Sequence, residues 1–436
     1  MEWSTQLGLG FAILLALFLS GLPVFASFFL INAIGTLVVI GPAGFGMFAN
    51  SVFDTATTKP LLTIPFFILL GEILFRSGTM EVLFDSVDKL VGRVRGRQYI
   101  LVISLSVILG ALSGAGMAVA AMLGRSVLPG MVKRGYNKTL SAGVILGGCG
   151  LAPIIPPSIL VIIIGTLSDT SIAKLLIAGI LPGLMLAGLF IVYVQYRIRT
   201  HAADAPADVS GEHQNVTPKD LAMAIVRMLP FTVIIFSVMG LILLGIATPT
   251  EAAATGVAGA MVAAAVNRRL TVRMLADASL GAAKISAMIL VIMVSSKMFT
   301  QLLSFTGATS GIINAVSSAG LDPSLMFLLM MLVPFVLCMF IDQIALMLVV
   351  IPIFAPLLGS LGFDPVWFWT IFLLNITVGG ISPPFGYALF ALRGATDLMT
   401  TGEVFKAAWP FVGIFLAAIV IMYFVPQIAT LLPALL

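Results

Sequence analysis

Residues 147–164 read GGCGLAPIIPPSILVIII, an almost wholly apolar stretch with three prolines in its middle. Such an apolar run is typical of a membrane segment, where no water is present to satisfy backbone groups that a break leaves unpaired. A break is tolerated there only where the freed carbonyl and amide groups find protein partners or line a cavity. The stretch therefore predicts a helix that is broken inside a membrane.

Composition places the whole chain in a membrane. The 436 residues are 60% hydrophobic and only 9% charged, whereas a soluble domain carries about 25% charged residues. Apolar runs of about 20 residues recur from end to end, which indicates spanning helices rather than barrel strands. The two cysteines, Cys149 and Cys338, lie far apart in apolar stretches and form no metal-ligand spacing. The sequence predicts an all-α polytopic membrane protein.

The chain also carries a weak internal repeat. Pro383-Pro384 follows Pro156-Pro157 by 227 residues, and at the same offset LPGMVKRGYN (128–137) corresponds to APLLGSLGFD (355–364). Both proline pairs lie in sequence that is apolar enough for a membrane span, and each pair follows the matching turn by about 20 residues. Repeats of this kind, with an odd number of crossings in each half, are typical of secondary transporters with two inverted halves.

The repeat predicts two units with the same order of elements. The first covers residues 1–199, the second covers 221–436, and a cytoplasmic linker at 200–220 joins them. Each unit contains scaffold helices, a surface arm, a re-entrant hairpin, a broken helix and a last helix. We expect these at 1–78, 80–97, 100–130, 139–168 and 175–197, and again at 222–302, 303–323, 324–357, 366–392 and 405–427.

The charge pattern predicts the orientation. Basic residues cluster at 89–97, 133–138, 197–199 and 268–273, and such clusters mark the cytoplasmic side. The segment 303–323 contains no Lys or Arg, as an external location requires. We therefore expect both chain ends outside and the linker inside.

The breaks and the hairpin tips bring together groups suited to a hard cation. Carbonyl ends of half-helices attract cations, amide ends attract anions, and two matching breaks indicate a central binding site. Sodium takes oxygen ligands, which carbonyls, hydroxyls and a carboxylate supply. The candidates are Ser113, Gly114, Gly116, the carbonyls of 147–150 and Ser158 in the first half, and Asp342, Asn375, Thr377, Gly379, Gly380 and Ser382 in the second.

Charged residues inside predicted spans need individual interpretation. Asp342 is the only acid in either hairpin, and an intramembrane acid is functional by default, the alternative being a hydrogen-bonded structural acid. Glu72, Glu251 and Lys297 lie outside the breaks, which favours interhelical pairing or snorkelling. Arg393 follows the second break and either meets an anionic substrate or marks the cytoplasmic side.

Several longer stretches are similar to one known family. They are PGMVKRGYNKTLSAGVILGGCGLAPIIPPSILVII (129–163), SIAKLLIAGILPGL (171–184), GIATPTEAAATG (245–256) and FDPVWFWTIFLLNITVGGISPPFGYALF (363–390). Together they resemble the large membrane subunit, the dicarboxylate-transporter M type, of the tripartite ATP-independent periplasmic (TRAP) transporters.

The resemblance implies a fold and a set of partners. It implies an elevator-type ion-transporter fold, in which hairpins and broken helices move against a scaffold, in the bacterial inner membrane. Sodium would be the coupling ion, with no other cofactor. The implied partners are a small four-span membrane subunit, a periplasmic binding protein and an organic anion such as a C4-dicarboxylate or a sialic acid. No nucleic acid is expected.

The resemblance also carries sodium sites onto individual residues. The first set is Ser113, Gly114, Gly148, Gly150, Pro156 and Ser158, and the second is Asp342, Thr377, Gly379, Gly380 and Ser382. Candidates for substrate binding are Asn375, Pro157, Pro384 and Arg393. Two positions depart from the family pattern, since Ala115 and Ser382 stand where the family usually has serine and threonine.

Two other functions are compatible with a polytopic chain. One is a stand-alone sodium–anion symporter that uses no binding protein. The other is an intramembrane hydrolase built on Asp342 and Asp169, but the sequence holds no paired intramembrane-aspartate motif, zinc-ligand motif or nucleophile elbow. A purely structural protein would not need two inverted broken helices. The sequence therefore favours transport.

Overall fold

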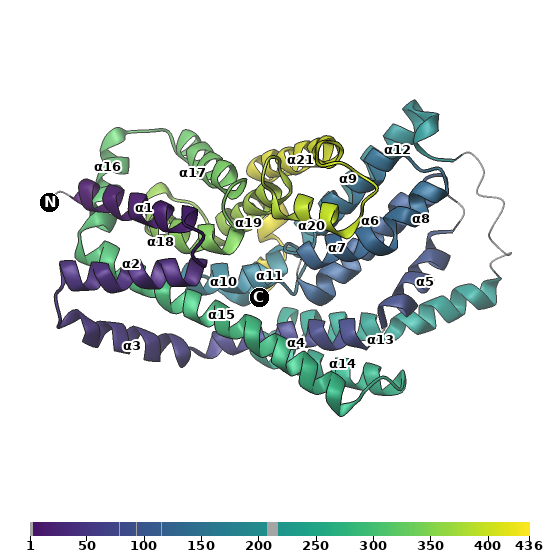
Figure 1. Ribbon diagram of the computed structural model, residues 1–436, viewed down its shortest axis with the longest axis horizontal. Helices are drawn as coiled ribbons and strands as arrows, with labels where there is room; N and C mark the ends of the chain where they lie inside the picture. The colour runs from purple at the N-terminus through teal and green to yellow at the C-terminus, as the bar shows by residue number, and fades with distance from the viewer. Residues whose placement is uncertain (1–2, 78, 93, 115, 207–216) are drawn as a thin grey trace.

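The computed structural model describes residues 3–77, 79–92, 94–114, 116–206 and 217–436 (Figure 1). Every regular element in these residues is a helix. Six helices are long and apolar enough to cross a membrane, and α3 with α4 adds a seventh if this pair, bent by 57°, is one span. Ala115 and the central part of the predicted linker, 207–216, lie outside the described residues.

The surface confirms the membrane environment. Large apolar side chains stand open to the surroundings, with Val38 77%, Phe424 75% and Val272 88% exposed. A water-soluble protein rarely exposes apolar patches of this extent. The chain is therefore an all-α multi-pass membrane protein, as its composition predicts.

One group of helices is organised around the 34-residue helix α15 (Val272–Phe305). This helix packs on α2, α3 and α4, and α4 in turn packs on α14. Figure 1 shows α1, α2 and α3 beside one end of α15 and α13 and α14 toward the other. The other members are α1 (Trp3–Leu19), α2 (Val24–Val39), α3 (Gly44–Ala56), η1 (Lys59–Leu62), α4 (Thr63–Arg76), α13 (Pro218–Leu243) and α14 (Pro249–Val266).

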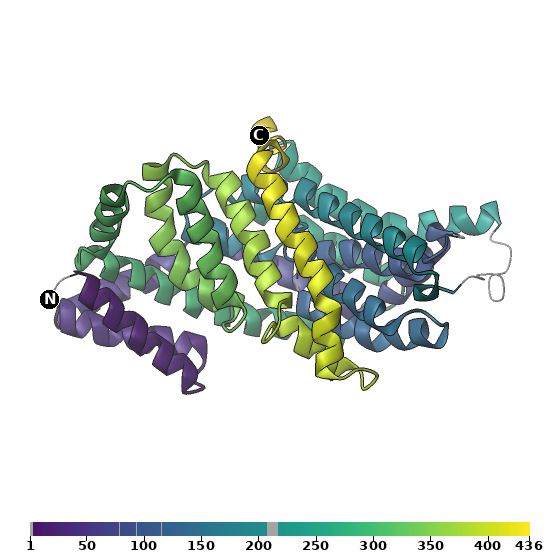
Figure 2. The same cartoon turned by 90° about the horizontal axis from the view of Figure 1, so that it is seen from above.

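The second group contains two helical hairpins and two interrupted helices. In Figure 2 α17, α18, α19 and α21 run side by side on one flank of the molecule. The hairpins are α6 (Arg97–Ser113) with α7 (Gly116–Ser126) and α8 (Leu128–Lys133), and α17 (Pro323–Cys338) with α18 (Gln343–Leu361). The interrupted helices are α9 (Lys138–Cys149) with α10 (Ile159–Leu167), and α19 (Pro365–Ile381) with α20 (Tyr387–Ala395).

The remaining helices connect or border these groups. Short helices occupy the two predicted arms, and the interrupted helices are followed by longer ones. The helices in the predicted arms are α5 (Thr79–Val91) and α16 (Ala308–Ala319). The helices that follow the interrupted ones are α11 (Ile172–Ala178), α12 (Ile180–Thr200) and η2 (Ala202–Asp204) in the first half, and α21 (Thr401–Phe424), α22 (Gln427–Thr430) and η3 (Pro433–Leu435) in the second.

The turns before α9 and α19 have the same construction. Gly135 and Gly362 adopt φ values of +81° and +70°, which glycine tolerates best. Two residues later Asn137 and Asp364 cap the helices, accepting hydrogen bonds from the amides of Leu140 (3.0 Å) and Trp367 (2.8 Å). Side-chain oxygens are the usual acceptors at helix starts. The matching turns support the repeat, whose inverted symmetry and domain boundaries stay predictions.

The start of the linker is attached to the first hairpin region. Asp204 is buried, pairs with Arg197 at 2.9 Å and accepts a hydrogen bond from the Asn137 side chain at 2.9 Å. The Tyr99 hydroxyl donates to the Asp204 carbonyl at 2.6 Å. These bonds tie the end of α12 to the first residues of α6 and α9.

Candidate functional site

The first hairpin tip lies inside the first helix break. Gly114 ends α6 with a φ of +59°, and a Cβ there would lie 3.0 Å from the Pro157 carbonyl oxygen. A Cβ on Gly116 would lie 2.6 Å from the carbonyl oxygen of Cys149. The bare backbone of the tip therefore occupies the space between the two ends of the break, and only glycine allows this approach.

The first break is buried, and it joins two short helices. Pro156 and Ser158 are both buried, and the Ser158 hydroxyl caps α10 by accepting from the amide of Val161 at 3.4 Å. Of the predicted first sodium ligands, the structure brings Ser158 against Gly114 of the tip, since a Cβ on Gly114 would lie 3.5 Å from the Ser158 Cα, and Pro156 lies in the same break. The side chain of Ser113 lies outside the described part of the chain.

The two other glycines of the first set have a packing role. Gly148 lies directly against the Ser106 side chain of α6, and its carbonyl accepts a hydrogen bond from Leu151 at 3.0 Å. A Cβ on Gly150 would lie 2.7 Å from the ring of Phe415 on α21. Both positions hold neighbouring helices close, and their role as ligands stays a prediction.

The second hairpin tip contains Asp342, which begins α18. Its Oδ1 accepts hydrogen bonds from the amides of Ile344 at 2.9 Å and Ala345 at 3.4 Å, and the side chain is exposed. Both of these amides donate to Oδ1, and neither donates to Oδ2. Asp342 is thus a helix cap, and one carboxylate oxygen remains available for a cation.

Gln343 attaches this tip to the second broken helix, a contact that the sequence reading missed. Its Nε2 donates to the carbonyl of Ile376 at 2.9 Å, and the Cys338 thiol donates to the same oxygen at 3.2 Å. A Cβ on Gly379 would lie 2.5 Å from the Cβ of Cys338. The sequence shows only an amide side chain directly beside Asp342 in an otherwise apolar tip, and it does not indicate the partner.

The hydroxyl groups predicted for the second site are buried and already donate their protons. Thr377 donates to the Leu373 carbonyl and Ser382 to the Val378 carbonyl, both at 2.7 Å. Each oxygen keeps lone pairs for another donor or a cation. Gly380 contacts the ring of Tyr387 at the start of α20, so α19 and α20 meet closely across the second break.

The four candidates for substrate binding occupy different surroundings. Asn375 donates to the Met331 carbonyl at 2.7 Å and joins α19 to α17. Arg393 donates to the Thr396 carbonyl at 3.0 Å and approaches Asp397 at 3.4 Å, in the turn after α20. Their roles in binding stay predictions. Pro157 is buried beside the first tip and Pro384 is exposed at the second break.

The two halves of the site interlock. α6 packs on α9 and α17 packs on α19, so each hairpin contacts its own broken helix. In addition, α7 of the first hairpin packs on α20, the second half of the second broken helix. In the same way, α18 of the second hairpin packs on α10, the second half of the first broken helix. The peptide bonds Pro156-Pro157 and Pro383-Pro384, at matching places, are both cis.

This architecture defines a class of protein. Two interrupted helices, each with a hairpin tip against its break, are the arrangement of membrane transporters whose site is built from half-helix ends. Comparison with known proteins then identifies the family. Residues 11–428 match the family described as "Tripartite ATP-independent periplasmic transporter, DctM component", and the chain belongs to this family.

Individual relatives agree with this assignment. The chain is 30% identical over 399 residues to the C4-dicarboxylate TRAP transporter large permease protein DctM of Pseudomonas aeruginosa, covering 91% of this chain and 92% of the relative. It is 31% identical to the ectoine/5-hydroxyectoine TRAP transporter large permease protein UehC of Ruegeria pomeroyi, covering 97% of each. These relatives are permeases, and the chain is a transporter subunit rather than an enzyme.

A solved structure shares the fold. The YdaH transporter of Alcanivorax borkumensis matches with a TM-score of 0.60 at 16% identity, over 89% of this chain and 87% of that one. Similarity at this identity concerns the fold alone. It agrees with an all-helical transporter architecture for the described residues.

Proposed function

We propose that this chain is the large permease subunit of a sodium-coupled importer for a small organic anion in the bacterial inner membrane. The observation that supports it best is the seating of each hairpin tip against a helix break. Such a break presents carbonyl groups that an intact helix would have paired. The first tip covers these groups with bare glycine backbone, and the second contacts its broken helix through the Cys338 and Gln343 side chains.

Sodium fits the donor set at both breaks. Carbonyl oxygens, two buried hydroxyls and the free oxygen of Asp342 are hard ligands, and hard cations prefer oxygen. The described residues contain no group of three His, Cys, Asp or Glu side chains suited to a transition metal. Neutral oxygens with a single carboxylate carry little negative charge, which suits a monovalent hard cation such as sodium.

The cargo and the partners come from family membership. The relatives named above are permeases for a C4-dicarboxylate and for ectoine, so the family does not fix a single cargo. We propose an organic anion that a periplasmic binding protein delivers and that a small membrane subunit helps to transport. A stand-alone symporter is the alternative.

Reconstitution separates these two possibilities. The chain, its small subunit and the candidate binding protein are placed in liposomes, and uptake of radiolabelled organic acids is followed with and without an inward sodium gradient. Uptake that needs both sodium and the binding protein supports the proposal. Uptake without the binding protein would establish the stand-alone symporter, and uptake indifferent to sodium would refute the coupling.

We propose an elevator mechanism for the movement. The interlocked hairpins and broken helices form one body, which contacts the scaffold mainly through α6, α10 and α18. At this boundary Ser296 of α15 donates to the Leu348 carbonyl of α18 at 3.2 Å.

A disulfide across this boundary tests the elevator. Cysteine substitutions at Ser296 and Leu348 should crosslink, because the Ser296 side chain already reaches the backbone of Leu348, and transport should stop on oxidation and return on reduction. Crosslink formation is measured first, since alpha carbons beyond about 7 Å are not bridged without movement. Full crosslinking with undiminished transport would refute relative motion of the two parts.

A further inference from the structure

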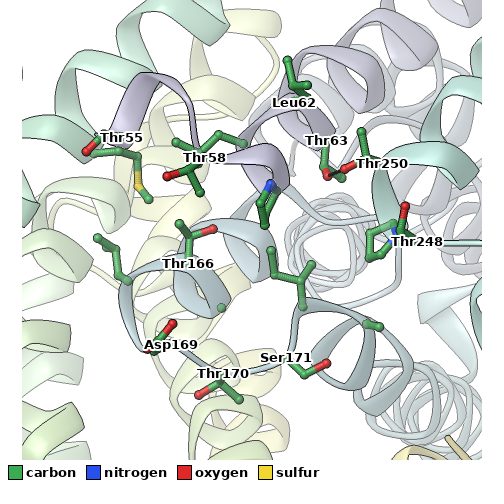
Figure 3. A pocket seen from close by; sticks show the side chains of 18 of the residues that line it. Thr55, Thr58, Leu62, Thr63, Thr166, Asp169, Thr170, Ser171, Thr248 and Thr250 are labelled. Carbon is green, nitrogen blue, oxygen red and sulfur yellow. Dashed lines mark hydrogen bonds between the residues drawn. The ribbon is translucent and has the colours of Figure 1, made fainter. Parts of the chain in front are cut away.

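A large cavity lies apart from the hairpin tips, between the two groups of helices (Figure 3). Its volume is about 1200 Å³. Four segments form its wall, namely the end of α3 with η1, the turn from α10 to α11, the start of α14 and the outer part of α15. Hydroxyl groups dominate the polar lining: Thr55, Thr58, Thr63, Thr166, Thr170, Ser171, Thr248, Thr250 and Thr300.

The cavity lies at the ends of two candidate spans that are opposite the linker. The candidate spans Ile172–Thr200 and Pro218–Leu243 both have one end at the linker. Their other ends adjoin Ser171 and Thr248, which line the cavity. With the linker in the cytoplasm, as the charge pattern predicts, these two walls lie toward the outside.

Most of the hydroxyls can only accept further hydrogen bonds. Thr58 donates to the Asp54 carbonyl at 2.6 Å, Thr166 to the Ile162 carbonyl at 2.7 Å and Thr300 to the Ser296 carbonyl at 3.0 Å. A hydroxyl has one proton and two lone pairs, so these oxygens offer lone pairs alone. Such a lining favours ligands that donate hydrogen bonds or carry positive charge.

One hydroxyl in the wall has no partner at all. Thr55 is only 4% exposed, and its Oγ1 forms no hydrogen bond with any described residue. A buried hydroxyl left in this condition costs free energy. The oxygen itself is buried, so Thr55 adds polarity to the wall without contacting the cavity in this arrangement.

The charges of the lining are predominantly negative. Asp169 and Glu251 line the cavity, and Lys297 is the one basic side chain among the described lining residues. The Lys297 ammonium lies 4.0 Å from the Asp54 carboxylate, which offsets its charge. The carboxyl end of α10 adds a partial negative charge from the helix dipole.

We propose that this cavity is an outer vestibule that concentrates monovalent cations, chiefly Na⁺, before they reach the hairpin tips. The inference rests on the sodium coupling proposed above. A cleft with an excess of one sign of charge raises the local concentration of the opposite ion, and here two carboxylates face one ammonium group that Asp54 offsets. The vestibule lies at the end of the nine-residue helix α10, and Ser158 at the first break lies at its start, a separation of about 13 Å at 1.5 Å per residue.

The sign of the vestibule potential is measurable with charged thiol reagents. Cysteine is introduced as Thr166→Cys in the complete transporter, and its reaction rates with a cationic and an anionic methanethiosulfonate are compared with those of a free thiol. We expect the cationic reagent to be favoured. Cys149 and Cys338 are buried, so the parent protein gives the background.

Charge substitutions test whether these particular residues create the potential. We take the reacting group to lie about 7 Å from the carboxylate. Asp169→Asn should then lower the ratio of the cationic to the anionic rate about twofold at physiological ionic strength and about sevenfold without ionic screening. Lys297→Gln should raise the ratio. Asp277→Asn is the matched control, since Asp277 lies 20 residues from Lys297 on α15, about 30 Å away.

Each outcome decides the inference. A preference for the anionic reagent, a ratio unaffected by Asp169→Asn, or no reaction of the cysteine above background would overturn it. The labelling needs no transport, so it remains interpretable if sodium coupling itself fails. In that case uptake would ignore sodium while the cation preference of the vestibule persisted.

Discussion

Replacing Gly116 by alanine tests the contact between the first hairpin tip and its break. Gly116 begins α7, and the new Cβ would lie 2.6 Å from the carbonyl oxygen of Cys149, with the Pro153 ring at 3.7 Å. The atom at 2.6 Å belongs to the backbone, so no flexible side chain can turn away. The tip must therefore withdraw from the break.

The size of the effect follows from the cost of overpacking. Inserting a methyl group into a well-packed site costs about 1–3 kcal/mol, which corresponds to a factor of about 5 to 150 in an equilibrium constant. The seated form of the tip should lose population by this factor. Initial rates of uptake should fall accordingly if transport needs the seated tip.

Gly130→Ala in the same hairpin region is the control. Gly130 lies in α8 and a Cβ there meets nothing within 4 Å, so alanine should be neutral or stabilise the helix by about 0.5–1 kcal/mol. Uptake into proteoliposomes and thermal unfolding are measured for both variants. Wild-type uptake by the Gly116→Ala protein would show that the tip does not need this close approach.

Three further substitutions test separate parts of the molecule. Asp342→Asn keeps the helix cap but removes the charge, and if Oδ2 binds sodium, the concentration for half-maximal uptake should rise about tenfold for each 1.4 kcal/mol lost; an unchanged sodium dependence would leave Asp342 as a cap alone. Gln343→Leu removes the bond to the Ile376 carbonyl and should lower the free energy of unfolding by about 1–3 kcal/mol, so calorimetry that finds no change would contradict the tie. A cysteine at position 210 should react with impermeant thiol reagents only from the cytoplasmic side. Labelling of this cysteine in intact cells would contradict the predicted topology and would place the linker outside.

Sequence reading identified the elements that local chemistry determines. Prolines and glycines in apolar sequence marked both breaks, and α9 ends at Cys149 before the first proline while α19 ends at Ile381 before the second pair. The helix-capping turns at Asn137 and Asp364 were visible because glycine and a short polar residue stand in sequence. These features depend on neighbouring residues alone.

Features that depend on distant contacts could not be predicted in this way. The tie from Gln343 to Ile376 joins residues 33 positions apart, and no local pattern distinguishes this amide from a solvent-facing one. Gly148 and Gly150 were assigned from the break, yet their bare faces also accommodate Ser106 and Phe415. The cavity combines four segments that are far apart in sequence, so its charge balance appears only in the folded chain.

The exchange of partners between the two halves bears on how the site must move. Each hairpin contacts its own broken helix through α6 or α17, and the other one through α7 or α18. At one such contact a Cβ on Gly124 of α7 would lie 2.6 Å from the Leu392 side chain of α20, so the helices are tightly packed. Movement of one tip alone would separate both contacts and expose the carbonyls of a break inside the membrane, which is costly. Displacing both hairpins and both broken helices together preserves these contacts and changes only the boundary with the scaffold, as expected when packed bodies switch between discrete arrangements. Ion and cargo sites built on these tips would therefore cross the membrane together.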